Sequence, residues 1–185
     1  EAYNPRTNTW RSCLPLSQRR RGAVAGVVGG CLVVAGGYGG GVGRLTSVEA
    51  YTPTGWTPLP PLPHATVGAT ACVLNGRLYV MGGYGCNKLQ VLEMSEENEF
   101  AWTVKADLPA ERYTAASAVV DGKLWVMGGI ENEEEEWTDS VLVYDIASNT
   151  WEAGTPLPRP MASCPAAVHD GELHLIDVGI GSETY

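Results

Sequence analysis

The chain has 185 residues, enough for one well-buried domain or a small array of repeats. Its formal net charge of −9 and pI near 4.7 argue against nucleic-acid and anionic-membrane binding, because phosphates would be repelled. The 23 glycines and 12 prolines, against one phenylalanine, indicate many short strands joined by turns rather than long helices.

The cysteines give a first expectation about the cellular compartment. They are odd in number, lack a CxxC spacing and follow no secretory signal at the first residues: Cys13, Cys31, Cys72, Cys86 and Cys164. We therefore expect reduced thiols in an intracellular, cytoplasmic chain.

Near the N-terminus, residues 23–43 contain no charged side chain and are long enough to cross a bilayer. The same stretch holds nine glycines, each of which disfavours a helix by about 1 kcal/mol relative to alanine. We predict strands here instead, and no membrane contact.

A repeat with a fixed interval explains these glycines. Three tryptophans each stand 26 residues before a diglycine: Trp10 before Gly36-Gly37, Trp56 before Gly82-Gly83, and Trp102 before Gly128-Gly129. The same interval from Trp151 ends at Asp177-Val178, where the pair is lost. Self-similarity at this period is the signature of a repeat architecture.

Each repeat contains a predicted β-hairpin just before the diglycine. Its two turn residues are Gly29-Gly30, Asn75-Gly76, Asp121-Gly122 and Asp170-Gly171 in chain order. Such pairs favour a type I′ turn, which needs positive φ at both central residues. The segments "ATACVL-NG-RLYVM" and "AASAVV-DG-KLWVM" are two copies.

Two more strands complete the unit. A third strand follows the diglycine loop at 47–51, 89–94 and 140–145, and a fourth begins at the tryptophan and leads into a proline-rich link. Four antiparallel strands in a repeat of 46 to 49 residues are typical of a β-propeller blade.

With these features the chain resembles a kelch-repeat β-propeller along essentially all of its 185 residues. The residues that carry the resemblance are the diglycines, Arg20 and Arg112 ahead of the alanine columns, and the pairs Tyr3/Trp10, Tyr51/Trp56 and Tyr144/Trp151. The chain departs from the pattern where Met94 is taken to replace the tyrosine, Thr66 and Met161 the arginine, and Asp177-Val178 the last diglycine.

The predicted fold is all-β, with four-stranded antiparallel kelch blades in a single domain spanning 1–185. Repeats are expected at 14–59, 60–105 and 106–154, with 1–13 and 155–185 forming a partial blade divided between the termini. The division leaves two alternatives: a piece of a larger propeller, which we favour, or a closed four-bladed ring.

Chemical sites find little support in the sequence. The run "GGYGGGVG" (36–43) does not satisfy G-x-G-x-x-G, and no Gly-Lys-Ser/Thr follows a diglycine, so the glycines are interpreted as structural. His169, Glu172 and His174 share a hairpin face that could ligate zinc, but packing between blades is the favoured interpretation. There is no G-x-S-x-G elbow. We expect no catalysis, metal or cofactor.

Binding is expected at one rim of the propeller, where the loops after the diglycines meet the links between blades. These loops differ strongly in length, and variable loops on a fixed scaffold commonly carry recognition. The candidate residues are Arg21, Tyr38, Arg44, Tyr84, Arg112, Ile130 and the acidic run Glu133, Glu134, Glu135 and Glu136. The alternative is that Tyr38 and Tyr84 pack on the diglycines and do not reach solvent.

The resemblance implies a protein–protein interaction module. Relatives with the "SVEAY" form of the repeat are often the substrate-recognition half of ubiquitin-ligase adaptors, and the partner would then be a ubiquitination substrate. The alternatives are a cytoskeletal or scaffolding kelch protein, or a propeller enzyme of the oxidase or sugar-epimerase kind.

Adaptors of this family often line a pocket with arginines two residues past the consensus arginine. Here these positions hold only small residues: Gly22, Gly68, Thr114 and Ser163. We therefore expect no acidic degron to be recognised in that manner.

Overall fold

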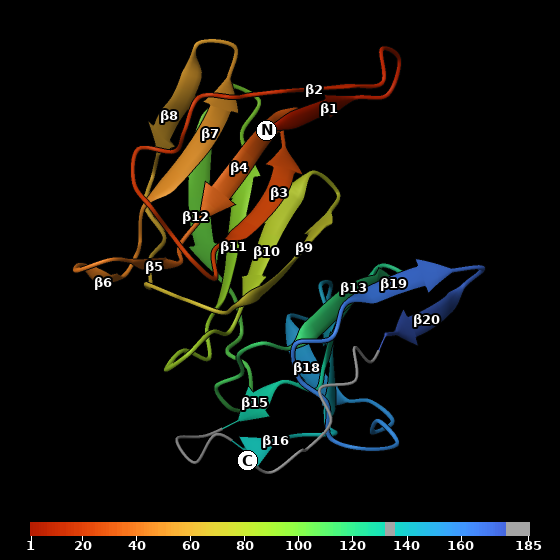
Figure 1. Ribbon diagram of the computed structural model, residues 1–185. Coiled ribbons are helices and arrows are strands. Elements are labelled where there is room, and N and C mark those ends of the chain that lie inside the picture. Colours follow the sequence, from red (N-terminus) through yellow and green to blue (C-terminus); the bar gives the residue numbers. More distant parts are fainter. Residues whose placement is uncertain (132–135, 177–185) are drawn as a thin grey trace, which may run out of the picture.

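The computed structural model describes residues 1–131 and 136–176, and every regular element in these ranges is a β-strand (Figure 1). Within the described residues there is no helix of the length and apolarity that a membrane crossing needs. The uncharged stretch 23–43 forms hairpin strands, so its glycines mark turns and joints.

Three antiparallel sheets of four strands form the body of the molecule. The first blade contains β3 (Val24–Val28), β4 (Cys31–Ala35), β7 (Val48–Thr52) and β8 (Gly55–Leu59). The second contains β9 (Thr70–Leu74), β10 (Arg77–Met81), β11 (Leu89–Met94) and β12 (Phe100–Val104). The third contains β13 (Ala116–Val120), β14 (Lys123–Met127), β17 (Val141–Asp145) and β18 (Thr150–Ala153).

The predicted hairpins lie at the expected positions. Asn75 and Gly76 have φ of 50° and 72°, and Asp121 and Gly122 have 49° and 72°, as a type I′ turn requires. The all-β fold of four-stranded antiparallel blades is therefore confirmed.

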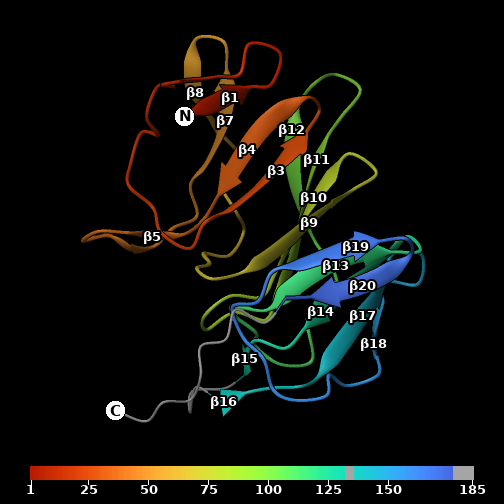
Figure 2. The same ribbon diagram turned by 45° about the vertical axis from the view of Figure 1, so that its right-hand side comes forward.

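The first strands of the blades pack side by side around a common axis, β3 against β9 and β9 against β13 (Figures 1 and 2). Apolar residues fill the space between neighbouring blades. Val33, Val80 and Leu92 are fully buried between the first and second blades, and Met81, Leu89 and Leu124 between the second and third. Burial of this kind contributes about 25 cal/mol per Å² of apolar surface.

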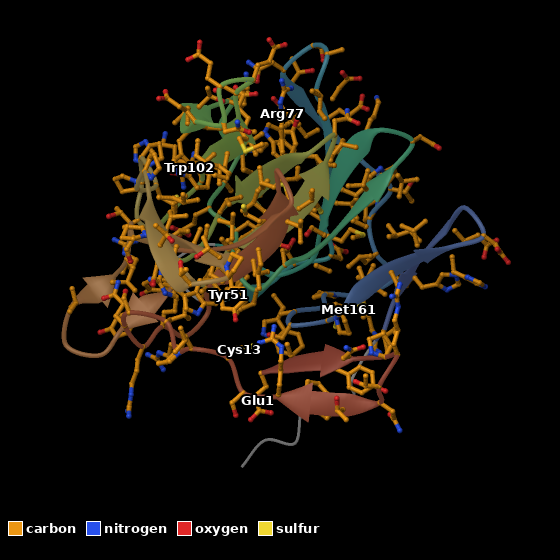
Figure 3. The ribbon with its side chains drawn as sticks, turned by 90° about the horizontal axis from the view of Figure 1, so that it is seen from above. Glu1, Cys13, Tyr51, Arg77, Trp102 and Met161 are labelled. Carbon is orange, nitrogen blue, oxygen red and sulfur yellow. The ribbon has the colours of Figure 1, made fainter. Side chains whose placement is uncertain are left out.

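The two terminal hairpins form separate sheets within the described residues. The hairpin of β1 (Ala2–Asn4) and β2 (Thr9–Arg11) does not pair with β19 (Ala166–His169) and β20 (Glu172–Leu175). Figure 3 shows Glu1 on this N-terminal hairpin, outside the four-stranded sheets. Among the described residues, the segments expected to share one blade, 1–13 and 155–176, are therefore not hydrogen-bonded to each other as strands.

The outer strands carry the aromatic pairs. Tyr3/Trp10, Tyr51/Trp56 and Tyr144/Trp151 are paired across strands, with ring centroids 5.2, 5.2 and 5.0 Å apart. The indole nitrogens of Trp56, Trp102 and Trp151 donate to the carbonyls of Leu14, Pro60 and Ala106, each in the link that enters the same blade.

One departure from the repeat must be corrected. The residue facing Trp102 is Leu92, and Met94 faces Phe100. Leu92 also pairs with Leu78, as Tyr51 pairs with Leu32 in the first blade. Because β11 continues two residues past Leu92, alignment by strand ends placed Met94 in the tyrosine column.

Candidate functional site

The diglycines form joints between neighbouring blades. The second glycine of each pair donates its N–H to a carbonyl of the next blade: Gly37 to Thr66 (2.8 Å), Gly83 to Arg112 (2.7 Å) and Gly129 to Met161 (2.7 Å). All six glycines have positive φ, and a Cβ on Gly82 would lie 2.3 Å from the Arg112 carbonyl oxygen. The N–H of the second glycine thus bonds the protein itself, and close approach explains the glycine pair.

A buried polar side chain supports each joint from within its own blade. Arg20 donates to the carbonyls of Gly36 (2.9 Å) and Ser47 (2.8 Å) and pairs with Glu49 at 2.5 Å. Arg112 donates to the carbonyls of Gly128 and Ser140, both at 3.1 Å, and pairs with Glu131. These contacts satisfy carbonyls that burial would otherwise leave unpaired.

The second blade replaces this ionic support with a neutral one. Thr66 is 1% exposed and donates to the Gly82 carbonyl at 2.7 Å, so it bonds the equivalent atom. Gln90, which is fully buried, stands at the Glu49 position and holds the backbone of His64 through its amide. Relative to the first blade, the second blade thus lacks both the arginine and the carboxylate. The two changes are expected together, because burying either charge without its partner would be costly.

Arg112 therefore does not belong to the binding surface. It is 2% exposed, and burial lowers the pKa of its guanidinium to about 10, which leaves it charged at neutral pH. The prediction from strand direction was right about the end of the blade at which Arg112 lies. It was wrong about exposure, because the guanidinium turns into the blade and donates to the Gly128 and Ser140 carbonyls.

The loop rim is the surface formed by residues 19–22, 38–46, 63–65, 84–88, 113, 130–131 and 136–139. Tyr38, Tyr84 and Ile130 occupy the same place in it, directly after a diglycine. Each donates its backbone N–H to the residue three positions ahead of the first strand of its own blade: Tyr38 to Arg21 (2.8 Å), Tyr84 to Val67 (2.9 Å) and Ile130 to Tyr113 (2.9 Å). Their backbones are fixed alike, while their side chains differ.

On the first blade, the loop forms a small hairpin of β5 (Tyr38–Gly39) and β6 (Gly43–Arg44). The Arg21 guanidinium lies 5.0 Å from the centroid of the Tyr38 ring, a cation–π distance. Tyr38 is 38% exposed and Arg21 is also exposed. Arg44 reaches the second blade, where Nη1 donates to the Tyr84 carbonyl at 2.7 Å.

On the second blade, Tyr84 is 51% exposed and stacks edge-on against Tyr113 with 5.2 Å between ring centroids. The alternative in which Tyr38 and Tyr84 are buried on the glycines is thus not what the structure shows. Tyr113 is 9% exposed and forms an isolated bridge with Ile130. Aromatic contact therefore runs from the second blade to the third.

On the third blade, β15 (Ile130–Glu131) pairs with β16 (Glu136–Trp137). Trp137, which faces Ile130, is 48% exposed, and Glu136 is exposed beside it. Glu133, Glu134 and Glu135 lie outside the described residues. Figure 1 shows β5–β6 and β15–β16 on the same side of the molecule, away from the β9–β10 turn.

Two rim aromatics were missed from sequence. Trp137 does not fit the tryptophan column, since no diglycine follows it at the fixed interval, and this misfit was an available signal. Tyr113 directly follows the arginine column, where the preceding repeats have Arg21 and Val67. Nothing in its own pattern indicated contact with Tyr84.

The axial end of the rim is a backbone ladder. Gly68 donates to the Gly22 carbonyl (2.9 Å), Thr114 to Gly68 (2.8 Å) and Ser163 to Thr114 (2.8 Å). All four residues have positive φ, between 52° and 67°. These are the positions where arginines would form an acidic-degron pocket, and here they supply small side chains and a continuous chain of amides.

The other candidate sites give no chemical arrangement. His169 and His174 have ring centroids 6.4 Å apart and lie exposed on the β19–β20 hairpin. No group of three ligand side chains in the described residues is placed to hold a metal ion. All five cysteines fall in described ranges and are free thiols. Burial raises the pKa of Cys72.

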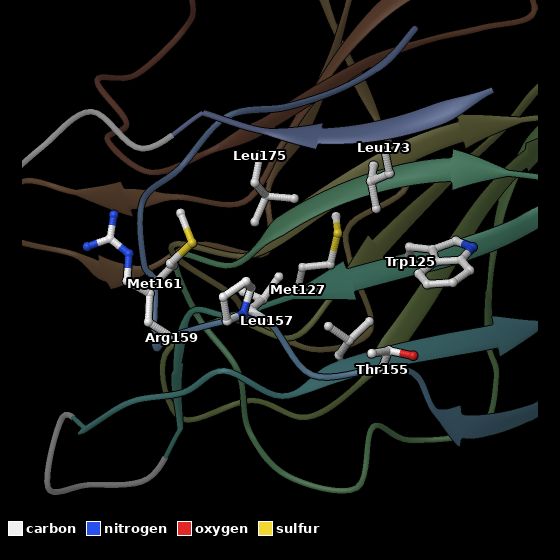
Figure 4. Close-up of a pocket in the computed structure, with 10 residues that line it drawn as sticks. Trp125, Met127, Thr155, Leu157, Arg159, Met161, Leu173 and Leu175 are labelled. Carbon is white, nitrogen blue, oxygen red and sulfur yellow. The ribbon is translucent and has the colours of Figure 1, made fainter. Parts of the chain in front are cut away.

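A cavity of about 420 Å³ opens between the third blade and the β19–β20 hairpin (Figure 4). Its walls are mainly apolar, with Trp125, Met127, Leu157 and Leu173 among the lining residues. Arg159 and Thr155 are its polar members among the described residues, so it contains no acid–base pair.

Four-stranded antiparallel blades packed around an axis define a β-propeller. The sequence matches two family models: the KLHDC2/KLHL20/DRC7 Kelch-repeats domain over residues 48–184 and the Kelch motif over residues 19–63. The chain belongs to the kelch-repeat family.

Relatives in the family resemble only part of the chain. Kelch-like protein 23 of Mus musculus and of Homo sapiens is 41% identical over 54 residues, which cover 29% of this chain and 10% of each relative. The solved structure of YjhT superposes with a TM-score of 0.79 at 15% identity, covering 94% of this chain and 66% of that one. At this identity the likeness concerns the fold.

Proposed function

We propose that the chain captures a protein partner on the loop rim, without chemistry of its own. The observation that carries this proposal is that each blade places an exposed aromatic side chain on the loop rim: Tyr38, Tyr84 and Trp137. Aromatic and arginine residues are over-represented in binding hot spots. Their backbones are already ordered by the joints, so binding costs little conformational entropy.

The rim also offers opposite charges at its two ends. Arg21 and Arg44 lie on the first blade, and Glu136 lies on the third. Charge distributed in this way favours one orientation of a bound partner and raises the association rate. We expect the acidic loop to attract a basic segment of the partner.

We further infer that the full-length protein is a ubiquitin-ligase adaptor, and that the partner is its ubiquitination substrate. Support comes from the "SVEAY" form of the repeat and from the similarity to kelch-like protein 23. The matched stretch spans 10% of that relative, so the role belongs to a longer protein. A cytoplasmic location, and a partner that is neither nucleic acid nor membrane, follow from the acidic charge and the thiols as expectations.

The test of the rim uses the full chain as bait and a partner identified by crosslinking. Tyr84→Ala and Glu136→Lys should each reduce capture while the thermal midpoint is unchanged. Glu96→Lys, at the opposite end of the second blade, is the matched control and should bind normally. Asn149 is unsuitable as a control, since its side chain accepts hydrogen bonds from Ala106 and Tyr144. Normal capture by both rim variants, with loss in Glu96→Lys, would show that the opposite rim is used.

The adaptor role is tested separately. The full-length transcript should encode a BTB or F-box segment beside this domain, and deleting that segment should stop ubiquitination of the captured partner without weakening capture. A full-length protein lacking both segments would exclude the adaptor role while leaving rim binding intact.

A further inference from the structure

A polar cavity of about 330 Å³ lies on the loop rim between the first and second blades. Three separate segments line it: Arg44 of β6, residues 63–65 of the link, and residues 85–88 of the next loop. Arg44, His64 and Lys88 contribute basic nitrogens, and no carboxylate is among the described residues that line it. In a chain of net charge −9, this makes the cavity a local exception.

Arg44 is held in place by the backbone of the second blade. Its Nη1 donates to the carbonyls of Tyr84 (2.7 Å) and Gly85 (3.3 Å). Gly85 has φ of 62°, and a Cβ there would lie 2.6 Å from Nη1. The positive φ favours glycine at this position, and the absence of a Cβ leaves room for the guanidinium beside the two carbonyls.

His64 is held by a side chain that has no contact with solvent. Gln90 is fully buried, accepts from the His64 N–H at 2.7 Å and donates to the His64 carbonyl at 3.1 Å. This clamp fixes the link backbone and therefore the position from which the imidazole projects. The two hydrogen bonds satisfy the buried Gln90 amide, and they hold the link at His64 in a single backbone conformation.

Lys88 comes from a loop that is tied to the following link. Asn87 and Leu108 exchange two hydrogen bonds of 2.8 and 3.2 Å. Lys88 itself pairs with Asp107 at 2.5 Å, but both side chains are about a third exposed. Such surface pairs contribute little, roughly 0–1 kcal/mol, so the ammonium is available to another anion.

We propose that this cavity is a subsite for a phosphorylated serine or threonine of a partner peptide, which rests on the loop-rim function proposed above. Donors from three segments suit a tetrahedral group with three acceptor oxygens, whereas a planar carboxylate would leave one of them unmatched. The neighbouring Tyr84 ring would contact the peptide beside the phosphoryl group. Partner capture then depends on phosphorylation of the partner.

The experiment compares three immobilised peptide libraries of random sequence with one fixed residue: phosphoserine, serine or glutamate. The full chain should be retained on the phosphoserine library at least about tenfold more than on the others, because charge-assisted hydrogen bonds to phosphate are strong. Arg44→Gln should lower phosphoserine retention to the serine level with an unchanged melting temperature, because the Arg44 side chain is exposed. Arg77→Gln, an exposed arginine at the opposite end of the second blade, is the matched control.

Several results would overturn the subsite. Equal retention on the serine and phosphoserine libraries, or retention that Arg44→Gln leaves unchanged, would remove it. Equal retention on the glutamate library would show that the cavity binds acidic side chains in general rather than phosphate. Equal binding of single-stranded DNA would show unselective anion binding. Failure on all libraries, with Tyr84-dependent partner capture intact, would overturn the subsite alone and leave the rim function standing.

Discussion

Gly83 and Tyr84 are neighbours in the chain, yet Gly83 belongs to a joint between blades and Tyr84 belongs to the loop rim. Gly83 donates to the next blade at 2.7 Å and has a φ that favours glycine, as do its counterparts in the other blades. Tyr84 has the same backbone bond as Tyr38 and Ile130, but the three side chains differ in exposure and contacts. The glycine that recurs at the joint holds neighbouring blades together, whereas the side chain one residue later varies from blade to blade, as the proposed recognition surface requires.

The strongest test of this division is removal of the charged support under a joint. Arg112→Met should lower the free energy of unfolding by about 3–5 kcal/mol, because Glu131 loses its partner and two buried carbonyls lose a donor. Urea unfolding measures the change. Arg77→Met is the control, since its pair with Glu93 is exposed and should contribute at most about 1 kcal/mol. Equal effects of the two substitutions would contradict a buried supporting role.

The joint glycine itself should rank next in effect. Gly82→Ala places a Cβ against the Arg112 carbonyl at positive φ, so we expect a loss of about 2–4 kcal/mol. Gly40→Ala is the matched control, because Gly40 has open space and no positive φ. Thermal unfolding of both variants separates the effect of the close contact with the Arg112 carbonyl from the general cost of replacing a glycine. Equal stability of the two variants would show that Gly82 is not needed for the contact between blades.

The rim should show small effects on stability. A double-mutant cycle of Tyr84→Ala and Tyr113→Ala should give a coupling of about 0.5–1.5 kcal/mol, as expected for an edge-on aromatic pair. A coupling of zero would mean that the two rings do not stack in solution. Tyr84→Ala alone should leave the fold intact and act on partner capture.

The smallest expected effect is a difference in thiol reactivity. Burial raises the pKa of Cys72, which lies inside the second blade, so less thiolate is present at neutral pH. Iodoacetamide should therefore label Cys72 more slowly than Cys13, which lies outside the strands, as mass spectrometry would record. Faster labelling of Cys72 would indicate that this sheet opens readily.

The sequence predicted the blades well because their determinants are local. Two-residue turns such as Asn75-Gly76 set the hairpins, and the tryptophan-to-diglycine interval set the repeat. The register of β11 was missed because the strand runs beyond Leu92 before its loop. Pairing across strands, which decides the tyrosine column, depends on contacts that strand ends do not reveal.

The make-up of the loop rim was predicted less completely than the blades. Tyr38, Tyr84 and Arg44 lie on the rim as expected, but Arg112 does not, because alternation along a chain does not tell which carbonyls a long side chain will meet. The contact of Tyr84 with Tyr113 joins residues of two different blades. Trp137 and His64 likewise acquire their place from the way loops and links meet in three dimensions.

The central claim is that the loop rim, and not the opposite end, binds the partner. Hydrogen exchange of the full chain with and without its crosslink-identified partner tests this most directly. We predict slower exchange on binding at 38–46, 84–88 and 136–139, with no change at 52–55 and 95–99. Slower exchange confined to 52–55 and 95–99 would contradict the account.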